Sequence, residues 1–92
     1  MAEGRMLLAQ IRDDVKGYVG SRVRVRANKG RRRVVEREGT LERAYPNLFV
    51  IKLDDEHHGR RITYTYADIL TETVELTVMD NDGNKTLAYQ VS

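Results

Sequence analysis

The chain contains no cysteine and no tryptophan, only one proline, and no long hydrophobic run among its 92 residues. Without cysteine there can be no disulfide framework, which excludes small disulfide-stapled secreted domains and favours the cytoplasm. No stretch approaches the roughly 18 apolar residues that a membrane span needs, and the opening Met-Ala-Glu-Gly-Arg lacks the apolar run of a signal peptide. We therefore expect a cytoplasmic chain that makes no membrane contact.

The first segment has the spacing of an amphipathic helix. Apolar residues from Leu8 through Ile11 to Val15 recur every three or four positions, with charges on the other face, and Gly17 is a natural stop. The pattern predicts a helix over about residues 5–16.

From Ser21 the hydrophobic period changes to two, which indicates β-strands. Val23, Val25 and Ala27 alternate with arginines, so that apolar and charged side chains lie on opposite faces of a strand. Further strands are expected near residues 32–45, 48–53, 61–66 and 73–78, and residues 86–91 are expected to form either a sixth strand or a loose tail. Gly39 predicts a bulge or sharp bend in the long second strand, and the apolar third strand predicts cover on both faces.

This order of elements predicts a mainly β fold. A helix, five short strands (six if the last segment joins) and a single helical turn before the fifth strand describe a small SH3-like or Sm-like barrel of antiparallel strands. A five-stranded OB fold stays open as the alternative, because the pattern does not fix strand order. We expect one domain over residues 1–92: the helix at 5–16, the barrel at 21–79, and a C-terminal hairpin or tail at 80–92.

The charges are distributed unevenly along the chain. The net charge is +2, but residues 1–44 carry +6 and residues 45–92 carry −4. Residues 22–33 contain seven cations and no acid: Arg22, Arg24, Arg26, Lys29, Arg31, Arg32 and Arg33. Such a stripe is typical of surfaces that bind nucleic-acid phosphates, although it is not specific to them.

A structural role for the strand arginines is the competing interpretation. Arg22, Arg24 and Arg26 could pair across strands with acids such as Glu72 and Glu75, each pair contributing about 0.2–1 kcal/mol. This does not account for Lys29 and Arg31–Arg33, whose crowding costs repulsion unless an anion or acidic surface offsets it.

Among the tyrosines, Tyr45 beside the only proline is expected to be exposed and is included with the seven cations as a nucleic-acid-binding residue. Tyr64 and Tyr66 share a face with Ile62, so packing in the core or at its rim is favoured over base stacking.

The residues give little support for catalysis, a metal or a cofactor. There is no cysteine nucleophile, no glycine-rich phosphate motif and no Ser-His-Asp set. His57 and His58 are neighbours in a polar turn, where adjacent imidazoles are poorly placed to share one ion. We predict a protein that is not an enzyme and has no metal site and no cofactor.

Three stretches carry a resemblance to a known family. The sequences "VRANKGRRR", "GTLERAYPNLFVIKL" and "YTYADILTETVEL" resemble the Veg proteins of Gram-positive bacteria, over about residues 7–79. The tail from Asp80 departs from the family's short ends.

The resemblance implies a cytoplasmic regulator with an SH3-like barrel that stimulates biofilm formation by relieving a transcriptional repressor of matrix genes. It implies no catalytic residues and no cofactor. The expected partner is DNA or RNA, bound through the basic stripe, or alternatively a transcriptional repressor protein bound directly. The chain is expected to be a monomer or a homodimer.

Overall fold

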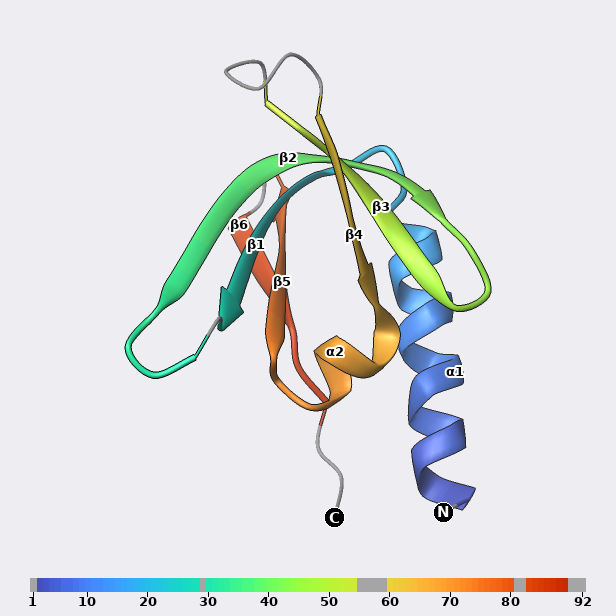
Figure 1. Ribbon diagram of the computed structural model, residues 1–92. Coiled ribbons are helices and arrows are strands. Elements are labelled where there is room, and N and C mark those ends of the chain that lie inside the picture. Colours follow the sequence, from blue (N-terminus) through green and yellow to red (C-terminus); the bar gives the residue numbers. More distant parts are fainter. Residues whose placement is uncertain (1, 29, 55–59, 81–82, 90–92) are drawn as a thin grey trace.

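The computed structural model describes residues 2–28, 30–54, 60–80 and 83–89, with side chains from residue 6 onward. It contains two helices and six strands (Figure 1). In chain order they are α1 (Ala2–Gly17), β1 (Arg22–Asn28), β2 (Val34–Ala44), β3 (Leu48–Leu53), β4 (Arg61–Thr65), α2 (Tyr66–Leu70), β5 (Val74–Asp80) and β6 (Gly83–Leu87).

The strands form one antiparallel sheet in the order β4-β3-β2-β1-β5-β6. Strands β1 to β4 follow one another as a meander, and the chain then returns through α2 to place β5 beside β1. This order is that of an SH3-like or Sm-like barrel and not of the Greek-key OB alternative. The described parts of β4 and β6 are the two edges, and the sheet curves without closing.

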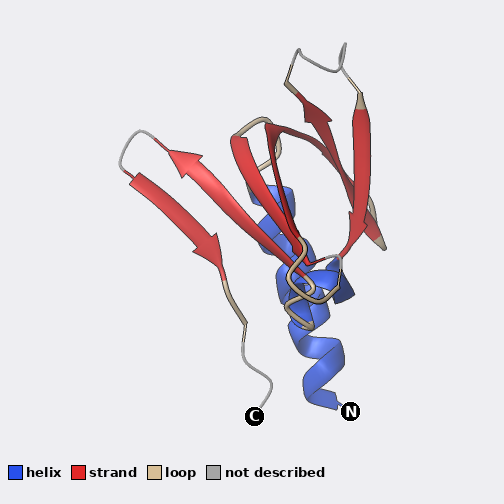
Figure 2. Ribbon diagram, turned by 60° about the vertical axis from the view of Figure 1, so that its left-hand side comes forward, coloured by secondary structure: helices blue, strands red, loops and turns tan. Residues whose placement is uncertain are grey.

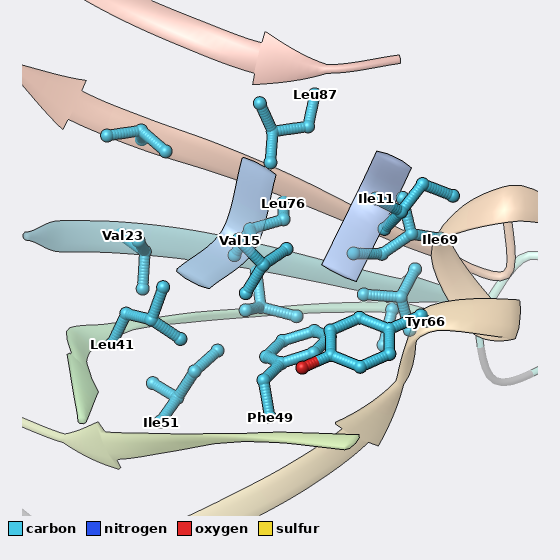
Figure 3. Packing of buried hydrophobic residues seen from close by; sticks show 14 of the residues in the cluster. Ile11, Val15, Val23, Leu41, Phe49, Ile51, Tyr66, Ile69, Leu76 and Leu87 are labelled. Atoms are coloured by element: carbon cyan, nitrogen blue, oxygen red, sulfur yellow. The ribbon is translucent and has the colours of Figure 1, made fainter. Parts of the chain in front are cut away.

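Both helices lie side by side against the curved sheet (Figures 1 and 2). The α1 face predicted from spacing is confirmed, because Ile11 and Val15 are fully buried and Gly17 ends the helix. These two side chains belong to the same buried cluster as the sheet residues Val23, Leu41 and Leu76, and Ile11 lies beside Ile69 of α2 (Figure 3). Within the described part of the chain, neither helix is long and apolar enough to cross a membrane.

The irregularity in the long strand β2 lies at a different position from the one expected. The β-bulge falls between Leu41 and Arg43, where the register with β3 shifts, and not at Gly39. Gly39 instead lies against the backbone of β3: a Cβ atom there would be 2.2 Å from the carbonyl oxygen of Lys52. The glycine is therefore required by the spacing of two backbones.

Strand β3 is covered mainly on one face. Phe49, Ile51 and Leu53 are buried, whereas Leu48 and Val50 are only partly buried and Lys52 is exposed, so the expected cover of the second face is incomplete. The possible sixth strand does form, as β6, although it begins three residues earlier than the pattern indicated, and Leu87 joins the core.

The two strand-end tyrosines pack as predicted. Tyr66 is buried, its ring lies 5.7 Å from that of Phe49, and its hydroxyl donates to the carbonyl oxygens of Tyr45 and, at 3.1 Å, Leu48 (Figure 3). Tyr64 is half-buried at the rim, with ring centroids 6.1 Å from Phe49. Tyr66 thus fastens the start of α2 to the β2–β3 turn.

Replacing Tyr66 with phenylalanine should lower stability by about 1 kcal/mol, because the ring is kept but the turn carbonyls lose their buried donor. For a domain of this size that is a fall in melting temperature of roughly 4–8 °C. Tyr45→Phe is the matched control, since the Tyr45 hydroxyl makes no hydrogen bond to any described residue and its side chain is exposed. Equal melting temperatures of the two variants would contradict this role of Tyr66.

Candidate nucleic-acid interface

The strand arginines lie on the sheet face opposite the core. Register places Arg24 beside Glu38 of β2 and Arg26 beside Glu75 of β5, because side chains of directly paired residues share a face. Arg22 forms an ion pair with Asp54, with two hydrogen bonds, and a second one with Glu38 at 3.9 Å; Arg24 pairs with Glu38 at 3.8 Å and Arg26 with Glu75 at 4.0 Å. The positive charges of these three arginines are therefore balanced by neighbouring carboxylates.

These pairs confirm the structural interpretation only in part. Glu75 is the expected partner of Arg26, but Glu72 pairs with none of the three arginines in the described structure. Asp54 is instead the partner of Arg22, and Glu38 is the partner of Arg24. Both ion pairs are half-exposed, so each contributes little to stability. No local pattern could predict Asp54 as the partner of Arg22, because the two residues lie 32 positions apart in the chain.

The loop arginines have a different environment. Arg31, Arg32 and Arg33 are exposed in the β1–β2 loop, and none of them has an ion pair with another described residue. Lys29 lies outside the described residues. Within the part of the basic stripe that can be placed, uncompensated positive charge is thus concentrated at the loop.

Asn28 and Gly30 shape the turn that leads into this loop. The Asn28 side chain accepts a hydrogen bond from the Gly30 N–H at 3.1 Å, and Gly30 has a φ of 128°. Arg32 also has a positive φ, 60°, which is uncommon for a residue with a side chain. Arg32 therefore has a backbone conformation that asparagine or glycine would adopt more readily.

The base of the loop is joined to the turn before β5. The Asn28 N–H donates to the Thr73 carbonyl at 2.9 Å, and an open hollow of about 550 Å³ lies between loop and turn. Arg31 and Arg32 line one side of it; Glu72 and the hydroxyl-bonded pair Thr71 and Thr73 line the other. Because Glu72 repels an anion from that side, the exposed loop is the better place for a phosphate.

Tyr45 does not lie beside the basic β1–β2 loop. It is 43% exposed, as expected, but it follows Ala44 at the end of β2, whereas the basic loop precedes Val34 at the start of the same strand. The two ends of β2 lie on opposite sides of the molecule (Figure 1). A single contact at the loop therefore does not include Tyr45.

One arginine outside the predicted set has an unusual position. Arg37 pairs in register with Val25, which is fully buried, so Arg37 lies on the core face of β2. The signal was present in the sequence, since counting back by twos from Leu41 passes Gly39 to Arg37 and Val35. Arg37 is exposed at this position, so its charge lies beside the apolar face and outside the stripe of residues 22–33.

Among the described residues no group of three or more His, Cys, Asp or Glu side chains could hold a metal ion. His57 and His58 lie outside the described residues.

In comparisons with known proteins, the family model of the biofilm formation stimulator VEG matches residues 6–77, which run from α1 into β5. No curated protein gives a significant match. The family match leaves β6 outside it.

Proposed function

The chain belongs to the family of the biofilm formation stimulator VEG, and we propose that it is a non-enzymatic cytoplasmic regulator that binds nucleic acid through its β1–β2 loop. By this binding it relieves a transcriptional repressor and so stimulates biofilm formation. The observation that supports the proposal is the contrast between the strand arginines, each paired with a carboxylate, and Arg31–Arg33, which have no acid partner among the described residues.

The proposed contact is with phosphates. Exposed guanidiniums on a loop can each donate two hydrogen bonds to a phosphate and displace condensed counterions, which supplies affinity without reading the base sequence. The strand arginines contribute less in this proposal, because a phosphate would first have to displace a carboxylate from each of them.

A protein partner is the second candidate, and the free edge of β4 favours it. Among the described strands, β4 pairs with β3 alone, so one row of its backbone groups is open to strand addition by another chain. In this alternative the family member binds a transcriptional regulator directly, and the loop cations attract an acidic surface.

A salt titration of binding tests the proposal. A fluorescein-labelled 20-base-pair DNA duplex and its single strand are titrated with the protein at several salt concentrations. If three or four phosphates are contacted, log affinity should fall against log salt with a slope of roughly −3 to −4 for the duplex. Undetectable binding of both probes at low salt would overturn the proposal in favour of the protein partner.

A further inference from the structure

A pocket lies on the core side of the sheet, where the first half of β2 runs past the end of β3. The register of β2 with β3 begins at Gly39 and Leu53, so Val35 and Arg37 extend beyond it. On the other side, Ile62 and Tyr64 of β4 pair with Ile51 and Phe49, which are core residues, and so face the same way. The pocket occupies about 290 Å³ and is lined by Val35, Arg37, Leu53, Arg60, Arg61, Ile62 and Tyr64.

The lining combines an apolar surface with positive charge. Val35, Leu53 and Ile62 supply aliphatic surface, and Tyr64 supplies a half-buried aromatic ring at the rim. Arg37 and Tyr64 line the same pocket, so a guanidinium and an aromatic ring border one site. Burial raises the pKa of the Tyr64 phenol, and the positive charge of Arg37 opposes that rise.

Two of the three arginines are available to a ligand. Arg61 is held by Glu42 through two hydrogen bonds, of 2.6 and 3.1 Å, which also hold the Glu42 pKa below its ordinary value of 4.5. Arg37 and Arg60 are exposed and form no ion pair within residues 6–28, 30–54, 60–80 and 83–89. The charge not yet compensated in the described part of the pocket is positive.

We propose that this pocket binds one nucleotide of a single-stranded nucleic acid. The base packs on the Tyr64 ring and the aliphatic surface of Val35 and Ile62, while Arg37 and Arg60 bind its phosphate. The inference rests on the proposed function and specifies the form of nucleic acid: base-paired nucleotides in a duplex are stacked on both faces and cannot enter such a pocket, whereas an unpaired base can. The pocket volume of about 290 Å³ is near the lower end of the range for sites that bind small molecules.

The pocket and the basic loop can contact the same strand. Arg33 immediately precedes β2 and Arg37 is four residues further on, a separation of roughly 13 Å along an extended backbone. A single strand that enters at the loop would therefore reach the pocket within a few nucleotides. The loop then supplies affinity, and the pocket supplies the preference for an unpaired base.

The test compares variants on a fluorescein-labelled 12-nucleotide single strand and on the same strand annealed to its complement. Arg37→Gln and Tyr64→Leu should each weaken single-strand binding by about 5- to 10-fold, because the first removes a phosphate contact and the second removes the ring on which the base stacks. Their affinity for the duplex should stay within about twofold of wild type. Arg43→Gln, which removes an equal charge from an exposed position on β2 outside the pocket, is the matched control.

Equal losses for Arg37→Gln and Arg43→Gln would overturn the pocket, since only overall charge would then matter. Competition gives a second test that needs no variant: adenosine monophosphate should displace the labelled strand at a concentration at least fivefold lower than inorganic phosphate, and equal potency would also overturn it. If the wild type binds strand and duplex with the expected salt dependence but these variants change nothing, the pocket fails and the loop proposal stands. If the wild type binds neither probe, both fail together.

Discussion

Gly39→Val is expected to destabilise the protein by more than about 3 kcal/mol, and the variant should be largely unfolded at 37 °C. The cause is steric, because a Cβ atom at position 39 would lie 2.2 Å from the Lys52 carbonyl oxygen and 3.0 Å from the Leu53 Cα. Both contacts are with backbone, which cannot move aside without separating β2 from β3. Since overpacking by side chains alone costs about 1–3 kcal/mol, a clash with a neighbouring strand should cost more.

Urea denaturation of the wild type and of Gly39→Ala measures the effect even if the valine variant does not fold. Alanine adds only the Cβ, so it isolates the clash, and we expect a loss of at least about 2 kcal/mol. Gly17→Ala is the control, because a Cβ there meets nothing within 4 Å and that glycine has no positive φ. Similar stabilities of the two alanine variants would show that β2 and β3 do not approach as closely as described.

Periodicity predicted the elements well where one face of an element is buried. The alternation of Val23, Val25 and Ala27 corresponds to β1, and the spacing of Ile11 and Val15 to the buried face of α1. These patterns are local and follow directly from the geometry of a strand or helix. Glycine 39 was also recognised as special from its position within a strand, although the physical reason is contact with β3 and not a bulge.

Contacts between distant segments could not be predicted in the same way. The bulge between Leu41 and Arg43 depends on how β3 aligns with β2, and the pair Arg22–Asp54 depends on where β3 ends. A count of cations along residues 22–33 likewise could not show which of them have carboxylate partners. The structure divides that stripe into paired strand arginines and exposed loop arginines, and this division makes the loop proposal more specific than the sequence did.

A variant of the loop cations is expected to separate binding from folding. It carries Lys29→Gln, Arg31→Gln, Arg32→Asn and Arg33→Gln; asparagine is chosen at position 32 because that residue has a φ of 60°, which asparagine tolerates well. The three arginines are exposed and make no ion pair with a described residue, so the melting temperature should be unchanged or slightly higher as mutual repulsion is relieved. Far-UV circular dichroism melts at two salt concentrations measure this.

The control variant removes the paired cations instead: Arg22→Gln, Arg24→Gln and Arg26→Gln. It leaves Asp54, Glu38 and Glu75 without their partners on one face of the sheet, so we expect a modest loss of stability and a smaller loss of binding. The control removes three cations and the loop variant removes four. If overall charge alone decided binding, the two variants would therefore lose similar amounts of affinity.

Binding should depend strongly on the loop. Each phosphate contact contributes about −0.9 to the slope of log affinity against log salt on a duplex, so the loop variant, which loses four cations, should lose up to about 3.6 units of slope and at least about 100-fold in affinity at low salt. Salt titrations of the wild type, the loop variant and the strand control on one duplex and one single strand give the three slopes directly. If the loop variant unfolds, the cations are structural. If it stays folded and keeps the wild-type slope while the strand control loses it, the phosphates contact the outer face of β1 and not the loop.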